Sequence, residues 1–237
     1  MKIALISDIH GNLIALREVL LDIENRNIDS MYCLGDLVGY GPFPNEVIDV
    51  MKEKGIPTVQ GNYDEKVTKD SNRSSLANDE IGNLSIKEQI LIWTQDNISK
   101  ENIKWLESLP EKIEVEVEGR KVLLVHGSPR RNNEYLYEGS TELDEIGEII
   151  DVDVMACGHT HKAYHEIVNG IHMINSGTVG RPKDGSPDIT YMIIDITDNN
   201  IETEMVKLEY DYEAVAKAIE DSDLPNEMAE KIRKGVK

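Results

Sequence analysis

Three of the six histidines in this chain fall within seven positions, directly after a run of apolar residues. His159 and His161 stand in the stretch MACGHTH, and His165 follows four residues later. Imidazole nitrogens bind transition metals, but two histidines at this spacing also occur by chance in loops and cores. Whether GHTH is half of a metal site therefore depends on the side chains that end the other apolar runs.

Metal-capable side chains follow five separate apolar runs, and four of these groups have a glycine next to their first ligand. The groups are Asp8 and His10 after KIALIS, Asp36 after MYCL, Asn62 after TVQ, His126 after KVLLV, and His159 and His161 after VDVMAC. Two Asp, one Asn and four His suit two first-row divalent ions that share a bridging carboxylate. No thiolate belongs to the set, which argues against a structural zinc site. We expect His165 and His172, which come after the pattern, to lie outside the site.

The apolar runs of the first half alternate with helical patterns. Strands are predicted at Lys2–Ser7, Ser30–Leu34 and Thr58–Gln60 with Ile56, and helices at Leu13–Ile23 and Asn45–Lys54. This β-α-β-α-β order indicates a parallel sheet, and ligands bind beyond the carboxyl ends of such strands. Glycines at these ends allow backbone segments to approach closely. An extended backbone would place Asp8 and His10 on one face, and likewise His159 and His161.

The second half of the chain has a more antiparallel character. The predicted strands are Ile113–Glu118, Lys121–Val125, Asp153–Cys157, Glu166–Val168, Ile171–Ile174 and Thr190–Ile196. A turn at Asn169-Gly170 is the strongest hairpin signal in the chain. A helical insertion is predicted at about 64–110 and a C-terminal helix at about 212–235. No linker divides residues 1–237, so we expect one α/β domain with two sheets face to face and helices outside.

The chain carries 45 acidic and 25 basic side chains, a formal charge of −20. Such a surface repels phosphate backbones and anionic membranes, so we expect neither a nucleic acid duplex nor a membrane as partner. No run reaches the ~18–20 apolar residues of a membrane span, and residues 1–7 are too short for a signal peptide. Cys33 and Cys157 lie in apolar runs, as reduced core thiols do. Together these features predict a cytoplasmic protein.

As a set, the ligand groups resemble the five blocks of the calcineurin-like metallophosphoesterases, with the same order and spacing. The matching blocks are Asp8-x-His10, Gly35-Asp36, Gly61-Asn62-x-Asp64, His126-Gly127 and Gly158-His159-x-His161. Further stretches (SDIHGN, GDLVGYGP, VHGSP and NSGTVGRPKDG) are similar to the bacterial and archaeal branch of small phosphodiesterases. The resemblance covers most of the chain and implies a four-layer α/β/β/α sandwich, which agrees with the two sheets expected above.

The resemblance also implies how the seven ligands divide. One ion would be held by Asp8, His10, Asp36 and His161, and the other by Asp36, Asn62, His126 and His159, with Asp36 as the bridge. A hydroxide between the two ions would then attack the phosphorus of a small phosphate ester. Manganese is the favoured metal, with iron, nickel and zinc as alternatives, because nitrogen and oxygen donors accept all four.

Tyr63 departs from the family pattern. Many members have a histidine at this position, which protonates the leaving oxygen, and a phenol with a pKa near ~10 is a poorer donor. We therefore expect substrates with good leaving groups, such as aryl, nucleotidyl or phosphoryl groups. Tyr63 either takes the catalytic donor role or packs as an aromatic wall of the crevice. Asp64 either orients its neighbour or caps the following helix.

Four further side chains are candidates for substrate binding. Arg181 has the fork that binds phosphate, although it would equally pair with a surface acid. Tyr40 stands in a Gly/Pro turn just past Asp36 and would stack on a substrate base. Ser128 and Arg130 follow His126 and are expected at the mouth of the site.

Two alternatives to a small-molecule phosphodiesterase stay open. The same metals would serve a phosphomonoesterase or a hydrolase of dinucleoside polyphosphates. Some relatives use this fold as a non-catalytic scaffold, although a scaffold has no need of all seven ligands. A protein phosphatase is less favoured because the usual proton donor is replaced, and a DNA-cutting enzyme because the charge is −20. Exposed strand edges would also allow a homodimer.

Overall fold

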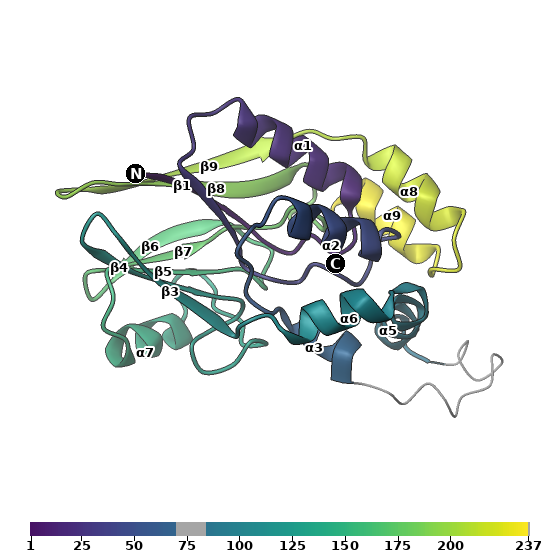
Figure 1. Ribbon diagram of the computed structural model, residues 1–237, viewed down its shortest axis with the longest axis horizontal. Coiled ribbons are helices and arrows are strands. Elements are labelled where there is room, and N and C mark those ends of the chain that lie inside the picture. The colour runs from purple at the N-terminus through teal and green to yellow at the C-terminus, as the bar shows by residue number, and fades with distance from the viewer. Residues whose placement is uncertain (70–83, 237) are drawn as a thin grey trace.

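The computed structural model describes residues 1–69 and 84–236 and contains two mixed β-sheets packed face to face (Figure 1). The first sheet has the order β2-β1-β8-β9, with β1 Lys2–Ile6, β2 Ser30–Cys33, β8 Ile189–Ile196 and β9 Ile201–Leu208. The second has the order β3-β4-β5-β7-β6, with β3 Lys112–Val117, β4 Arg120–Val125, β5 Val154–Cys157, β6 Tyr164–Val168 and β7 Ile171–Asn175. Both sheets contain parallel and antiparallel pairs, which confirms the predicted fold class.

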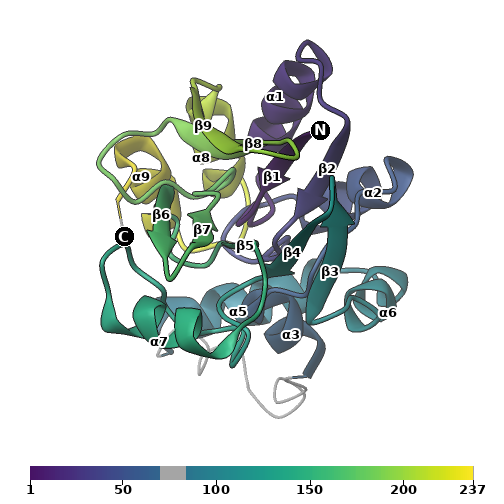
Figure 2. The same cartoon turned by 90° about the vertical axis from the view of Figure 1, so that its left-hand side faces the viewer.

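Eight described helices flank the sheets. They are α1 Leu13–Glu24, α2 Pro44–Glu53, α3 Asn62–Lys69, α5 Ile86–Asn97, α6 Lys100–Glu107, α7 Thr141–Ile149, α8 Tyr212–Glu220 and α9 Glu227–Lys234. Figure 2 shows α7 on the outer side of the second sheet, and α1 and α8 on the outer side of the first. The side chain of Asn12 accepts the backbone N–H of Ala15, so it caps α1.

Strand alternation divides the apolar side chains into three layers. On β1, Ala4 and Ile6 face α1, α2, α8 and α9, whereas Ile3 and Leu5 face the second sheet. On β4, Leu124 packs between the sheets and Leu123 faces the outer layer with α7. Because successive side chains of a strand point to opposite faces, two sheets with three apolar layers require helices on both outer sides. This is the four-layer sandwich.

Three elements differ from their predictions. Residues 56–60 form only an isolated bridge from Thr58 to Cys33, because Pro57 has no N–H to donate to a longer ladder. The predicted C-terminal helix is two helices, α8 and α9, separated by a turn that contains Pro225, which cannot continue a helix. The edge strand β9 was not predicted, because its IETEMVKL sequence carries many charges. Of the predicted helical insertion, residues 70–83 lie outside the described residues.

No helix in the described ranges, 1–69 and 84–236, has the length and apolarity needed to cross a membrane.

Candidate metal centre

The site forms where the carboxyl ends of β1 and β2 in one sheet meet those of β4 and β5 in the other. Within the first sheet the N–H of Asp8 donates to the carbonyl of Gly35 (2.9 Å), and within the second the N–H of Gly158 donates to the carbonyl of His126 (2.9 Å). Further bonds join the two sheets: the N–H of His159 donates to Oδ2 of Asp8 (2.9 Å), and Nδ1 of His126 donates to the carbonyl of Leu34 (2.7 Å). The loops after all four strands are therefore tied into one rigid unit.

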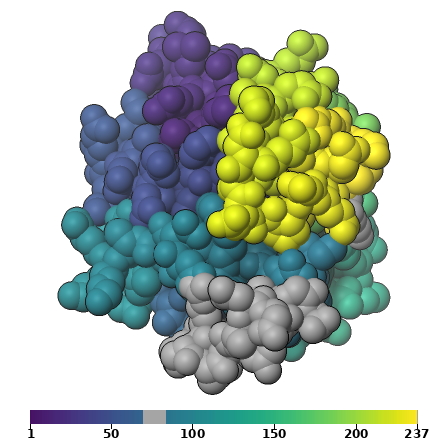
Figure 3. Space-filling view, turned by 90° about the vertical axis from the view of Figure 1, so that its right-hand side faces the viewer, coloured from purple at the N-terminus to yellow at the C-terminus, as the bar shows by residue number. Residues whose placement is uncertain are grey.

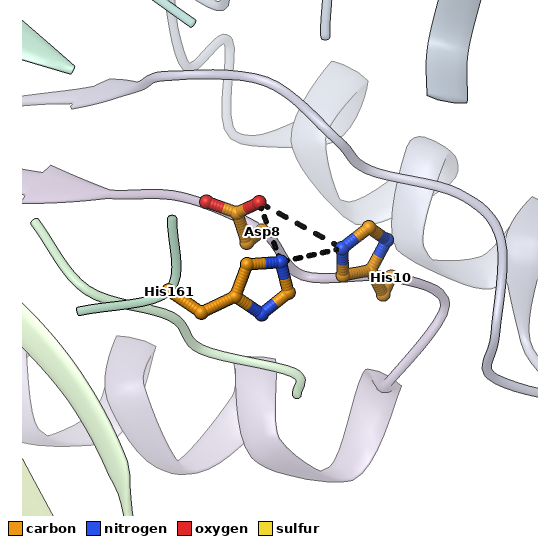
Figure 4. A group of neighbouring side chains, drawn as sticks. All are labelled: Asp8, His10 and His161. Carbon is orange, nitrogen blue, oxygen red and sulfur yellow. Dashed lines mark hydrogen bonds and ion pairs between the residues drawn. The ribbon is translucent and has the colours of Figure 1, made fainter. Parts of the chain in front are cut away.

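Asp8, His10 and His161 form the first of two buried clusters (Figure 4). Nε2 of His161 lies 3.0 Å from Oδ1 of Asp8 and 3.2 Å from Nε2 of His10. Asp36, His126 and His159 form the second cluster. Oδ2 of Asp36 lies 3.4 Å from Nε2 of His126 and 3.6 Å from Nε2 of His10, so this one oxygen faces both clusters.

Asn62, the first residue of α3, completes the set. Its Oδ1 lies 3.1 Å from Nε2 of His126. The structure thus brings all seven predicted ligands together, from five separate segments of the chain.

Backbone carbonyls fix how three of the histidine rings are protonated. Nδ1 donates to a carbonyl oxygen in His10 (to Val38, 3.0 Å), in His126 (to Leu34, 2.7 Å) and in His161 (to Arg181, 2.6 Å). With Nδ1 occupied as a donor, the Nε2 lone pair of each neutral ring points into the cluster. Such outer partners orient histidine ligands in metal sites.

The donor set fits divalent metal ions. Oδ1 of Asp8 and Nε2 of His159 are buried and have no hydrogen-bond partner among the described residues, a costly state unless a cation satisfies them. The Nε2 atoms of His10 and His161 face each other at 3.2 Å, where two lone pairs repel unless a cation lies beside them. Burial opposes protonation of His126, yet Asp36 and Asp8 raise its pKa to about 9, which shows the demand for positive charge.

The ligands are held by a left-handed backbone, which corrects one prediction. We expected an extended chain to align Asp8 with His10 and His159 with His161, but all four have positive φ angles, of 53°, 49°, 63° and 61°. Asp36 has a φ of 56°. Such angles are uncommon outside glycine and concentrate at functional sites, where the surrounding structure enforces them.

Two glycines allow the close approach that was predicted for the strand ends. A Cβ on Gly61 would lie 2.1 Å from the backbone nitrogen of Asp36, and one on Gly158 would lie 2.0 Å from Oγ of Ser7. Any side chain at these positions would push the ligand loops apart, so the sites need glycine for space rather than for φ.

This geometry can be compared with known proteins. Residues 1–199 match the model of the calcineurin-like phosphoesterase superfamily domain. The chain belongs to the calcineurin-like phosphoesterase superfamily. The family implies hydrolysis of phosphoester bonds with divalent metals, and the two clusters are candidate metal-binding sites.

The chain is similar to other proteins over nearly its whole length. The chain is 34% identical to an uncharacterised protein of Methanocaldococcus jannaschii, over 97% of this chain and 96% of that protein. It is similar to a metallophosphoesterase from Sphaerobacter thermophilus, with a TM-score of 0.83, 28% identity and coverage of 100% and 99% of the two chains. A hypothetical protein from Pyrococcus horikoshii has a TM-score of 0.88 at 20% identity, with the same coverage, and shows the fold alone.

Tyr63 occupies the position where many family members have a histidine. Its side chain is buried and lines the cavity beside the two clusters, which we name the metal cavity. Its hydroxyl shares a short hydrogen bond with the hydroxyl of Tyr40, and its ring meets His10 edge-on, with centroids 5.5 Å apart. Burial, and then Tyr40, raise the pKa of Tyr63 above its ordinary value of 10. This phenol is therefore an even poorer proton donor than an exposed tyrosine.

Asp64 lies beneath the site and makes no contact with the cavity. Its carboxylate accepts the N–H groups of Gly61 (2.9 Å), Asp36 (2.9 Å) and Leu37 (2.9 Å). It therefore caps α3 at Gly61, as predicted, but it holds the Asp36 loop instead of orienting Tyr63. Burial and the nearby Asp36 raise the pKa of Asp64 to about 7. Asp64 is a positioning residue, and its prediction as a catalytic residue is not supported by this geometry.

The predicted substrate-binding residues separate into two groups. Arg181 and Tyr40 line a metal cavity of about 190 Å³, with the guanidinium of Arg181 4.0 Å from the ring centroid of Tyr40. Ser128 and Arg130 line a different cavity instead. Ser128 hydrogen-bonds to Glu134 and Arg130 forms ion pairs with Glu134 and Glu145, which hold both side chains away from the metals. Their predicted place at the mouth of the site is therefore wrong.

Sequence reasoning missed five residues that line the metal cavity: Lys66, Lys87, Asn133, Tyr135 and Lys183. The ring of Tyr135 packs against the ring of His159, with centroids 4.2 Å apart. The only signal was the Tyr-x-Tyr pair in NNEYLYEG, a loop without regular structure. Lys66 lies on α3, Lys87 on α5 and Lys183 in a loop much further along the chain, so no local pattern connects them.

Proposed function

We propose that this protein hydrolyses small phosphodiesters with two divalent ions, manganese being favoured, held by the seven ligands described above. The observation that carries the proposal is the position of Oδ2 of Asp36, 3.6 Å from Nε2 of His10 and 3.4 Å from Nε2 of His126. These imidazoles belong to different clusters. A carboxylate oxygen between two such clusters is suited to bridge a pair of ions.

The side chains around the cavity favour water as the nucleophile. Its described lining contains no Ser, Thr or Cys. Burial raises the pKa of both thiols, Cys33 and Cys157, the latter to about 11, so neither is a thiolate near neutral pH. When bound, two divalent ions would supply Lewis acidity toward a phosphate and a water of lowered pKa.

The cavity supports substrates whose leaving groups depart without a proton. Tyr63 holds its proton tightly, and the cavity histidines are positioned as ligands. An aryl, nucleotidyl or phosphoryl group leaves as a stabilised anion and needs little protonation, whereas a simple alkoxide needs a proton donor. The buried guanidinium of Arg181 is available to neutralise charge on a phosphate oxygen.

The test compares bis(4-nitrophenyl) phosphate with 4-nitrophenyl phosphate on protein stripped of metal and then supplied with manganese. We expect manganese-dependent cleavage of both and a higher kcat/KM for the diester. A preference for the monoester would favour the phosphomonoesterase alternative. Failure to cleave either ester with two manganese ions bound would contradict the proposal. Failure to bind manganese at all would favour the scaffold.

A further inference from the structure

A second, larger cavity of about 590 Å³ opens beside the metal cavity. The two cavities share five lining residues: Tyr40, Lys87, Tyr135, Arg181 and Lys183. The larger cavity also reaches Ile86 at the start of α5, and Met228 and Lys231 on α9. Figure 3 shows the yellow C-terminal helices packed beside the blue-teal segment that contains α5. Helix α9 lies beyond residues 1–199, the part of the chain that matches the family model.

The charge of this outer cavity is opposite to that of the protein. The chain has 45 acidic and 25 basic side chains, yet the described lining contains no Asp or Glu. It contains four basic residues: Lys87, Lys183, Lys231 and Arg181. A concave surface lined by one sign of charge concentrates ligands of the other sign. The lining of the outer cavity therefore favours an anionic ligand.

Arg181 is built to hold an anion where the two cavities join. It is only 8% exposed, and its Nε is buried without a hydrogen-bond partner among the described residues. The ring of Tyr40 supports the guanidinium from one side at 4.0 Å. A buried guanidinium without an acidic partner is costly, and a phosphate oxygen pair satisfies it with two parallel hydrogen bonds.

Apart from Ser85 and Thr160, the remaining wall is aromatic and apolar. The rings of Tyr135 and Tyr137 lie parallel within 3°, with centroids 5.8 Å apart, although the two residues are 47% and 38% exposed. Ile86 and Met228 add apolar surface. Flat aromatic groups stack favourably on such rings, and every nucleobase has a flat face.

We propose that the outer cavity binds the second phosphate and the base of a nucleoside polyphosphate whose scissile phosphate lies in the metal cavity. Arg181 and Lys183 would bind the second phosphate, and the Tyr135–Tyr137 wall would hold the base. This inference rests on the proposed hydrolase function and names the substrate class of that site.

Hydrolysis of a nucleoside polyphosphate suits the residues that line the two cavities. The oxygen of water bonds to phosphorus, and the bond from phosphorus to the bridging oxygen breaks. The electron pair stays on the departing phosphate, and the proton of water passes to solvent. The new negative charge lies beside Arg181, so the leaving group needs no proton from Tyr63.

Binding is tested by titration calorimetry on the full chain, with and without manganese, using α,β-methylene adenosine diphosphate, which cannot be cleaved at the bridge. Adenosine monophosphate and methylenediphosphonate are the comparison ligands. We expect the diphosphate analogue to bind at least about tenfold tighter than either, because only it fills both subsites. Equal or weaker binding of the analogue would overturn the inference.

Two variants locate the subsite. Lys231→Gln and Arg181→Gln should each weaken the analogue by about tenfold. Lys234→Gln, one turn further along α9 and outside the cavity, should leave its affinity unchanged. If neither cavity variant weakens binding, or if Lys234→Gln weakens it equally, the inference is wrong. Lys231 is half-buried on α9 and pairs with Glu227 (2.8 Å), outside the apolar core, so its variant stays informative if Arg181→Gln misfolds.

An activity comparison separates this inference from the proposed function. The unmodified protein with manganese is given diadenosine tetraphosphate and bis(4-nitrophenyl) phosphate, and we expect a higher kcat/KM for the nucleotide. Cleavage of the aryl diester without binding or cleavage of the nucleotides would overturn the inference and leave the proposed function intact. Tight binding of the analogue without hydrolysis of any substrate would overturn the proposed function and leave the binding site for the second phosphate and the base intact.

Discussion

The carboxylate of Asp64 accepts the backbone N–H of Asp36 at 2.9 Å, so a buried acid outside the cavity holds the residue that faces both metal clusters. Its oxygens also accept the N–H groups of Leu37 and Gly61. A single side chain therefore connects the loop after β2 with the start of α3, which carries Asn62. The position of two ligands depends on it.

Replacing Asp64 with Asn should reduce stability and metal affinity together. The amide would present an NH₂ group to at least one backbone N–H, and a buried donor left without an acceptor costs about 1–3 kcal/mol. We expect a lower midpoint in urea unfolding and weaker manganese binding by calorimetry. Asp144→Asn, on the exposed face of α7, is the matched control. Unchanged unfolding and manganese binding in Asp64→Asn would contradict the positioning role.

Replacing Tyr63 with Phe should leave diester cleavage within about threefold of the original rate, because the phenol does not act as proton donor. The substitution should instead lower the stability of the fold, because the hydroxyl of Tyr40 loses its hydrogen bond with the hydroxyl of Tyr63. The measurement is kcat on bis(4-nitrophenyl) phosphate beside the thermal midpoint. A loss of kcat of about 100-fold, with the fold intact, would assign Tyr63 the donor role after all.

Replacing a histidine inside the candidate metal site should affect metal binding and activity, whereas replacing a histidine outside it should not. His161→Asn should lower the bound manganese and reduce diester cleavage by about 100-fold or more, because a direct donor is lost. His172→Asn should change neither, because His172 contacts His165 (2.9 Å) and belongs to neither cluster. Metal content by mass spectrometry and kcat/KM are the readouts. Equal effects of the two substitutions would argue against the assigned ligand set.

The His165–His172 pair should make the folded state sensitive to mild acid. Burial, and then the neighbouring His172, lower the pKa of His165. Burial, and then Arg120, lower the pKa of His172, although Asp153 acts in the opposite direction. His165 also contacts the hydroxyl of Thr203 on β9. Because the folded state binds these protons less readily than the unfolded chain, stability is full above the ordinary histidine pKa of about 6.5 and falls as the pH drops below it.

The check compares the original protein with the double variant His165→Gln and His172→Gln in urea unfolding at pH 7.5 and pH 5.5. The original protein should lose more stability between the two pH values than the variant does. Other histidines titrate in both proteins, so their contribution cancels in the comparison. An equal loss in both would show that the pair carries no pH dependence.

The sequence by itself was enough to predict the candidate metal ligands and most of the elements. Short continuous apolar runs predicted β1, β4, β5 and β8 close to their limits, and Asn169-Gly170 predicted the β6–β7 hairpin. The seven ligands were predictable because each follows directly after a local segment that ends at the same edge of its sheet. Position along the chain therefore carries information about position in space.

Only the tertiary structure decided the parts that depend on contacts between distant segments. The left-handed backbone at Asp8 and His159 is imposed by neighbouring loops rather than by local preference. Ser128 and Arg130 follow His126 in sequence, yet a hydrogen bond from Ser128 to Glu134 and ion pairs of Arg130 with Glu134 and Glu145 hold them elsewhere. The outer cavity joins α5, α9 and the Tyr135 loop. These segments lie far apart in the sequence, so no sequence window contains them. Side chains far apart in sequence meet only when the core is packed, and packing is a property of the whole chain.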